Sequence, residues 1–155
     1  MREAIGGSWL FGLVITFIMF FASFLALSIN YAKAFNVKND VVDLISKYEG
    51  NNCKARCAIK EHLSDVGYLV PGKCASGFTG YDLNGNRIYG NSKAYFCIKA
   101  QDTGTSTSIK KSFYRAQIFF KVDLPVIGDL LTLKINGDTE YIFFATDEIN
   151  NCSCS

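Results

Sequence analysis

Six cysteines are the residues of this sequence whose type and spacing most clearly imply chemistry. They form two close pairs and two single positions: Cys53, Cys57, Cys74, Cys97, Cys152 and Cys154. An even number of cysteines in a small domain behind an apolar segment is typical of a disulfide framework in an oxidising compartment. The close pairs could instead bind zinc, although zinc knuckles usually have Cys-x2-Cys spacing, and partly free thiols are the third option. We expect three disulfides.

The spacing of the cysteines also predicts their pairing. A bond between Cys74 and Cys97 closes a loop of 22 intervening residues, worth about 3 kcal/mol in the chain-entropy model. The pair at 53 and 57 lies one helical turn apart, and the pair at 152 and 154 alternates along an extended tail, so each pair shares a face. We therefore expect the tail to be bonded to a helix that begins near residue 54, in an order that the spacing does not assign.

Other motifs give weaker chemical signals. His62, the one histidine, is close to Ser64 and Asp65, but neighbours on one helix point in different directions and do not converge as a Ser-His-Asp triad. Residues 82–86 resemble the start of a calcium loop, yet the glycine comes two residues early and Lys93 replaces the glutamate expected at the twelfth position. We therefore predict no enzyme activity, no metal site and no cofactor.

An uncharged segment of 22 residues, 8–29, precedes all of these positions. A helix of this length is about 33 Å long and matches the roughly 30 Å of bilayer hydrocarbon. Its few serine and threonine hydroxyls can bond back to helix carbonyls. A signal peptide with cleavage near residues 32–34 is the alternative, but signal apolar regions are about 7–15 residues long. We expect residues 1–34 to form a membrane-spanning or filament-core helix that stays in the mature chain.

The helix is predicted to continue beyond the uncharged segment. Apolar residues recur at spacings of three and four, with polar residues between them, up to Tyr48. Gly50 is a suitable stop, so one helix is expected from about residue 4 to 49, apolar all round in its first half and amphipathic in its second. A second helix is predicted over 54–66, ending at Gly67.

The rest of the chain has the pattern of strands and turns. Asn84-Gly85 predicts a hairpin between strands at 81–83 and 87–89, and further strands are expected at 94–99 and 112–122. The dipeptide Asn136-Gly137 predicts another hairpin, between strands at 130–135 and 141–145. The expected fold class is α+β: a long N-terminal hydrophobic helix packed on a disulfide-stapled antiparallel sheet of four or more strands. Residues 35–155 would form the extracellular domain, beginning with the amphipathic half of the same helix.

The charges of the chain are nearly balanced, with 16 Lys and Arg against 14 Asp and Glu. Proteins that bind nucleic acid or anionic surfaces usually have a clustered basic excess. We therefore expect no nucleic-acid partner. All six cysteines follow the apolar segment, so Arg2 is expected to be cytoplasmic and the domain exported.

The order of these features carries a family resemblance. Glu3 precedes an apolar helix, whose amphipathic continuation leads into a disulfide-bearing sheet, and this arrangement resembles the type IV pilin superfamily. Residues 30–45 (NYAKAFNVKNDVVDLI) look most like the Tad (tight adherence) minor-pilin branch, and residues 120–142 are similar to its C-terminal strands. The chain departs from the family's leader-cleavage motif, because no glutamate stands five residues after Gly6 or Gly7.

The resemblance implies a structural subunit of an extracellular pilus-like filament that self-assembles through its apolar helix. Small residues let helices approach closely in apolar surroundings, and a carboxylate at the edge of such a segment needs a cation, such as a neighbour's Arg2 or N-terminal amine. The residues expected at the assembly interface are Glu3, Gly6, Gly7, Gly12, Phe17, Phe20, Phe21 and Phe24.

The expected partners follow from this function. They are other copies of the chain in a homopolymer, the cytoplasmic (inner) membrane before assembly, and the pilus assembly machinery, with the cell surface as the final location. The alternative function is a monomeric, single-pass membrane-anchored binding module, whose disulfide domain holds a ligand or partner outside the cell.

Overall fold

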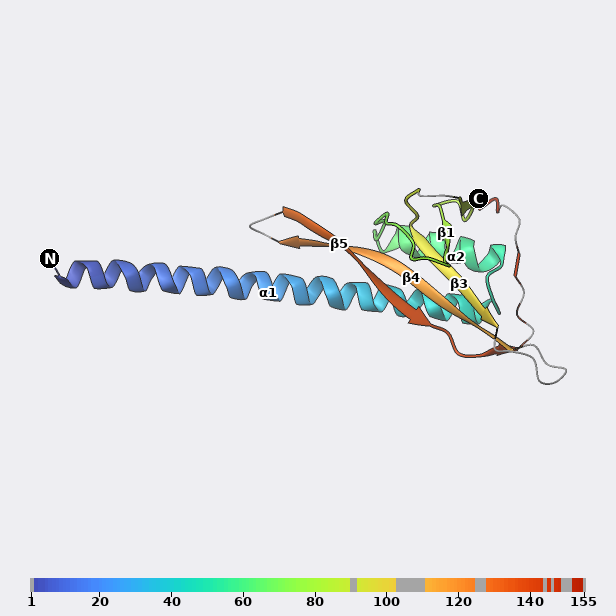
Figure 1. The fold of residues 1–155 in the computed structure, drawn as a ribbon, viewed down its shortest axis with the longest axis horizontal. Helices are drawn as coiled ribbons and strands as arrows, with labels where there is room; N and C mark the ends of the chain where they lie inside the picture. Colours follow the sequence, from blue (N-terminus) through green and yellow to red (C-terminus); the bar gives the residue numbers. More distant parts are fainter. Residues whose placement is uncertain are drawn as a thin grey trace.

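The computed structural model describes residues 2–89, 92–102, 111–124, 128–143, 145, 147–148 and 152–154, with the backbone alone for 2–6, 122–124 and 128–131. Two helices precede six strands: α1 (Arg2–Lys47), α2 (Cys53–Asp65), β1 (Thr79–Tyr81), β2 (Arg87–Ile88), β3 (Phe96–Asp102), β4 (Lys111–Leu124), β5 (Gly128–Asp138) and β6 (Ile142–Phe143). Figure 1 shows the long helix beside the sheet. The expected α+β class, with a long apolar N-terminal helix and a disulfide-bearing antiparallel sheet, is confirmed.

α1 is much longer than the sheet on which it packs. Its 46 residues correspond to about 69 Å at 1.5 Å per residue, and its N-terminal half projects away from the rest of the molecule (Figure 1). Two residues with positive φ end it, Glu49 at 55° and Gly50 at 133°, and the Gly50 amide donates to the Ile45 carbonyl at 3.0 Å. This is the stop that the sequence predicts at Gly50.

α2 runs back beside the C-terminal end of α1 (Figure 1) and carries the first two cysteines. It begins after Asn52, whose side chain accepts a hydrogen bond from the Ala55 amide at 2.9 Å and so caps the first turn. Ile59 and Leu63 on its inner side are buried, and Gly67, with φ 66°, follows its end. The predicted helix 54–66 is therefore confirmed within one residue at each end.

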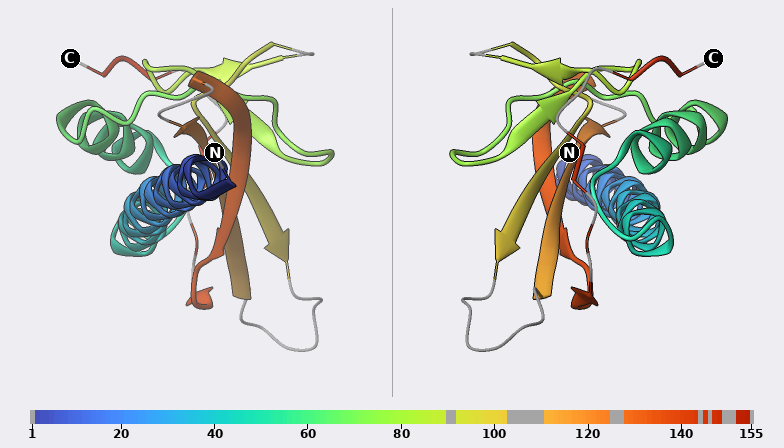
Figure 2. Two further views of the ribbon diagram at one scale, coloured as in Figure 1. Left: turned by 90° about the vertical axis from the view of Figure 1, so that its left-hand side faces the viewer. Right: turned by 90° about the vertical axis from the view of Figure 1, so that its right-hand side faces the viewer.

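The strands form one antiparallel sheet in the order β2-β1-β3-β4-β5, with β6 paired to the start of β4. β4 is the longest strand and hydrogen-bonds to β3 on one side and to β5 on the other. Figure 2 shows α1 and α2 on one face of the sheet, while the loop before β1 projects from the opposite face. We call the sheet, α2 and the C-terminal half of α1 the head domain.

The core of the head domain lies between α1, α2 and the inner face of the sheet. α1 contributes Val37, Val41 and Ile45, each at most 2 % exposed. Their spacing of four residues puts them on one side of the helix, as the amphipathic pattern predicts. The other fully buried members are Ile59, Leu63, Tyr81, Phe96, Ile98, Tyr114, Ala116 and Ile118.

One predicted hairpin is confirmed and the other is wrong. Gly85 has φ 76° in the turn that joins β1 to β2, as expected. By contrast, Asn136 and Gly137 do not form a turn: they lie inside β5, where Gly137 pairs with Ala116 of β4. The following segment gives β6, which pairs with β4 and not with β5.

The physical reason for this error is the close approach of α1 to β5. A Cβ atom at Gly137 would lie 2.8 Å from Cγ2 of Val42 and 2.9 Å from Cδ of Lys38, closer than real Cβ contacts. The glycine is therefore needed because a helix crosses the strand there, whereas in an Asn-Gly turn it would be needed for positive φ.

Candidate functional site

The N-terminal half of α1 is an apolar surface that the described residues leave largely uncovered. Fifteen large apolar side chains between Trp9 and Ile29 are each at least 38 % exposed, and Phe20 reaches 74 %. The hydroxyls of Thr16, Ser23 and Ser28 bond back to helix carbonyls four residues earlier, at 2.9 to 3.0 Å. By length and composition this helix can cross a membrane.

A shallow hollow, lined by residues of α1 alone, lies on this exposed surface around Gly12. Ser8, Gly12 and Thr16 are four residues apart and therefore follow one line along the helix, with Trp9 and Phe17 among the bulky residues beside them. Apart from the neighbouring backbone of α1 itself, no atom of the described residues lies within 4 Å of a Cβ added at Gly12. The helix backbone is thus accessible to a neighbouring helix at this point.

Six of the eight residues expected at the assembly interface lie on the exposed half of α1: Gly7, Gly12, Phe17, Phe20, Phe21 and Phe24. The rings of Phe17 and Phe21 stack with centroids 6.4 Å apart. The side chain of Glu3, and the surroundings of Gly6, lie outside the part of the chain whose side chains the structure describes.

The exposed half of α1 ends where the helix meets the sheet. Ala34 is fully buried against Phe120 of β4, and the ring of Tyr31 packs edge-on against Phe120 with centroids 6.3 Å apart. Tyr68 joins this cluster from the loop after α2. Its buried hydroxyl has no hydrogen-bond partner among the described residues, and burial raises the pKa of Tyr68 to about 12.

Three disulfides staple the head domain: Cys53–Cys152, Cys57–Cys154 and Cys74–Cys97. The bond between Cys74 and Cys97 is the one expected around the β1–β2 hairpin. The other two join α2 to the C-terminal tail, as the spacing predicts, and their order is now assigned. Because disulfides persist in oxidising compartments, these bonds are typical of an extracellular or periplasmic domain.

A buried arginine strengthens the attachment of the tail. Arg56 on α2 is fully buried, and its guanidinium donates to the carbonyls of Gly85 at 3.1 Å and Glu148 at 2.6 Å. Its charge also lies 5.2 Å from the centre of the Tyr81 ring. Sequence reasoning missed this residue, because nothing in the helical pattern separates a buried arginine from the surface cations around it.

Polar side chains on the described part of the chain form structural pairs. His62 contacts the Asp40 carboxylate of α1 at 3.0 Å, so it links the two helices. No group of three or more His, Cys, Asp or Glu side chains in the described residues is placed to hold a metal ion.

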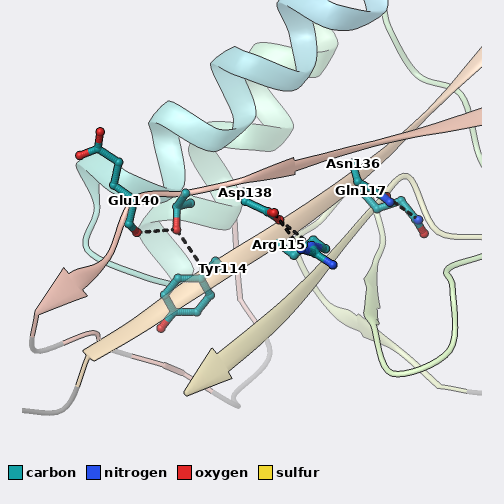
Figure 3. Close-up of polar contacts among 7 residues, drawn as sticks. Tyr114, Arg115, Gln117, Asn136, Asp138 and Glu140 are labelled. Atoms are coloured by element: carbon teal, nitrogen blue, oxygen red, sulfur yellow. Dashed lines mark hydrogen bonds and ion pairs between the residues drawn. The ribbon is translucent and has the colours of Figure 1, made fainter. Parts of the chain in front are cut away.

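The outer face of the sheet carries two polar pairs between β4 and β5 (Figure 3). Arg115 binds the carboxylate of Asp138 through two nitrogens, one at 2.8 Å, and Gln117 donates to Asn136 at 2.8 Å. The hydrogen bonds from Arg115 lower the pKa of the Asp138 carboxyl below its usual value. This end of β5 is therefore held at a fixed register on β4.

A groove between the C-terminal part of α1 and residues 138–143 is a feature that sequence reasoning missed. It has a volume of about 620 Å³, and we call it the Tyr141 groove after its most exposed aromatic residue. Its lining residues are Val42, Asp43, Ser46, Glu49, Asp138, Glu140, Tyr141, Ile142 and Phe143. Tyr141 and Phe143 are exposed while Ile142 between them is buried, as in an edge strand with one exposed face, but the groove itself depends on the approach of α1.

Comparison with protein-family models, curated proteins and solved structures finds no match for this chain. The fold and the site define a class of protein: a disulfide-bonded α+β head domain on a long helix whose projecting half is apolar and exposed.

Proposed function

We propose that the protein is a pilin-like structural subunit of an extracellular filament, anchored in the cytoplasmic membrane by the apolar half of α1 until it assembles. The observation that carries this proposal is the fifteen exposed apolar side chains on that half. Full burial of such a side chain is worth about 1.5–3 kcal/mol, so leaving all of them in water forfeits on the order of 20 kcal/mol. This exceeds the roughly 5–15 kcal/mol of a typical domain's stability. Lipid or other copies of the helix must cover the surface.

Two features favour other copies as the final cover. Lipid chains adapt to any apolar helix, whereas the hollow at Gly12 suits the close approach of a second helix. α1 is also one uninterrupted helix from Arg2 to Lys47, so a bundle of its N-terminal halves would hold every head domain at a fixed place outside the bundle. The family resemblance of the sequence points to the same arrangement.

The direct test is electron microscopy of material sheared from the surface of cells that express the full chain. We expect filaments that bind an antibody against the head domain, and we expect protease added to intact cells to remove the head domain from unassembled protein. If the protein is inserted in the membrane with its head outside and forms no filament, the proposal fails, and the membrane-anchored binding module becomes the better reading.

A further inference from the structure

The Tyr141 groove combines an apolar floor with an acidic rim. Its described lining includes the carboxylates of Asp43, Glu49, Asp138 and Glu140, and no lysine or arginine. Arg115 pairs with Asp138 from the outer face of the sheet, and Asp43 and Glu140 add two further carboxylates to the rim. The groove therefore favours a positively charged occupant.

Exposed rings make the groove suitable for the apolar stem of a lysine as well as for its charge. Tyr141 is 58 % exposed and Phe143 is 49 % exposed, while Ile142 between them is buried. Lys111 lies 5.1 Å from the Phe143 ring and lines a neighbouring hollow, which shares Glu140, Tyr141 and Phe143 with the groove. Lysine stems pack on apolar surface and ammonium groups are attracted to aromatic faces, so both parts of the side chain would be matched.

A basic patch lies on the opposite face of the sheet. Gly72 and Ala94 exchange two backbone hydrogen bonds of 2.8 Å, and this antiparallel bridge brings the next residues along, Lys73 and Lys93, close together. Nζ of Lys99 reaches the same loop, 3.4 Å from where a Cβ of Gly77 would lie. No carboxylate is among the described residues that line the hollow of about 240 Å³ at this loop. Like charges held together in this way repel one another until an anionic surface covers them.

We propose that the Tyr141 groove of one copy binds the patch formed by Lys73, Lys93 and Lys99 of the next copy. The groove lies on the side of the sheet that carries α1, whereas the loop with the basic patch projects from the other side (Figure 2). A contact between two different surfaces of the same molecule is head-to-tail and can repeat without closing, which is the symmetry of a filament. This inference rests on the proposed function, to which it adds a specific contact between head domains.

Charge reversal in the full-length chain tests the contact. Glu140→Lys and Lys73→Glu should each lower the yield of sheared filaments, relative to membrane-inserted protein, by about fivefold or more, because every subunit repeats the new repulsion. The double variant restores opposite charges across the contact and should recover at least half of the wild-type yield. Glu61→Lys and Lys54→Glu make the same charge changes on exposed positions of α2 outside both surfaces, and should leave the yield unchanged.

Each outcome distinguishes the proposed contact from the proposed function. Wild-type protein that inserts but forms no filament overturns the proposed function, and the contact with it. Filaments that tolerate both single reversals as well as the α2 controls overturn the contact alone. If Glu140→Lys lowers the yield but Lys73→Glu and Lys93→Glu do not, the groove binds a different cationic partner and the second-copy assignment is wrong. An unchanged unfolding midpoint for every variant shows that the head domain still folds.

Discussion

The two halves of α1 are one continuous helix in opposite surroundings. In the C-terminal half, Ala34, Val37, Val41 and Ile45 follow each other at three or four residues and are at most 2 % exposed. In the N-terminal half, apolar residues occupy every side of the helix and all the large ones are exposed. A single stripe of apolar side chains is enough to hold a helix on a sheet. A helix that is apolar on every side must instead be surrounded by apolar groups, such as lipid chains or other helices. Stability of the head domain and association through the helix should therefore be separable by mutation.

The largest expected effect comes from releasing the tail. Replacing Cys53, Cys57, Cys152 and Cys154 by serine removes both tail disulfides, which span 99 and 97 positions. One such loop of about 100 residues is worth about 4–5 kcal/mol in the chain-entropy model, so the head domain should lose most of its stability. In detergent micelles, near-ultraviolet circular dichroism should report loss of head packing while much of the far-ultraviolet helix signal remains from the exposed half. Loss of that helix signal as well would show that the exposed half of α1 depends on the head domain for its structure.

Truncation of one isoleucine in each half gives the next largest difference. Ile45 is fully buried against the sheet, and Ile45→Ala should lower the free energy of unfolding of the head domain by about 2–5 kcal/mol. Ile15 is 42 % exposed on the projecting half, and Ile15→Ala should change it by less than about 0.5 kcal/mol. Denaturant unfolding of the full chain in micelles, followed by tyrosine fluorescence of the head, measures both. Equal losses would show that the projecting half also supports the head.

Two glycines, one in β5 and one in the exposed half of α1, test the same difference between head stability and helix association. Gly137→Ala places a methyl group 2.8 Å from Val42 and should destabilise the head domain by about 1–3 kcal/mol through overpacking. A Cβ added at Gly12 points into open space in a single copy, so Gly12→Leu should leave both membrane insertion and head stability unchanged. It should nevertheless reduce filament yield, because the added bulk would keep neighbouring helices apart. Normal filaments from Gly12→Leu would count against packing of copies at this hollow.

Local patterns were enough to predict the helices, the β1–β2 hairpin and the attachment of the tail to α2. Each depends on residues close in sequence: the helical spacing, the turn around Gly85, and the shared face of Cys53 and Cys57. The order of the tail bonds could not be predicted, since it depends on the direction in which the tail crosses α2.

Contacts between distant segments account for the remaining differences. Gly137 has the local signature of a turn, and the approach of α1 overrides it. The burial of Arg56 requires the tail and the turn at Gly85 to meet on α2. The Tyr141 groove likewise forms where α1 passes residues 138–143. In each case the deciding neighbour is tens of residues away, where neither periodicity nor turn chemistry carries information.

The smallest expected effect concerns the boundary between the two halves of α1, where Tyr68 packs near Ala34 and Phe120. Burial raises the pKa of Tyr68 to about 12, whereas a tyrosine in the unfolded chain ionises near 10. The unfolded state therefore loses its phenolic proton first, and the free energy of unfolding should fall as the pH rises from about 10 to 12. Tyr68→Phe removes this contribution. Because the hydroxyl has no partner among the described residues, this variant should lose little or no stability at neutral pH.

Denaturant midpoints of the wild type and Tyr68→Phe between pH 9 and 12 would measure this difference. The wild type should lose more stability than the variant over that range. Tyr114, whose pKa is also raised by burial and by its hydrogen bond to Asp147, contributes equally to both proteins and cancels. All six cysteines are bonded, so no free thiolate is present to start disulfide exchange at high pH. Parallel alkaline losses in the two proteins would mean that Tyr68 is open to water, and that the buried part of α1 begins further along the helix than Ala34.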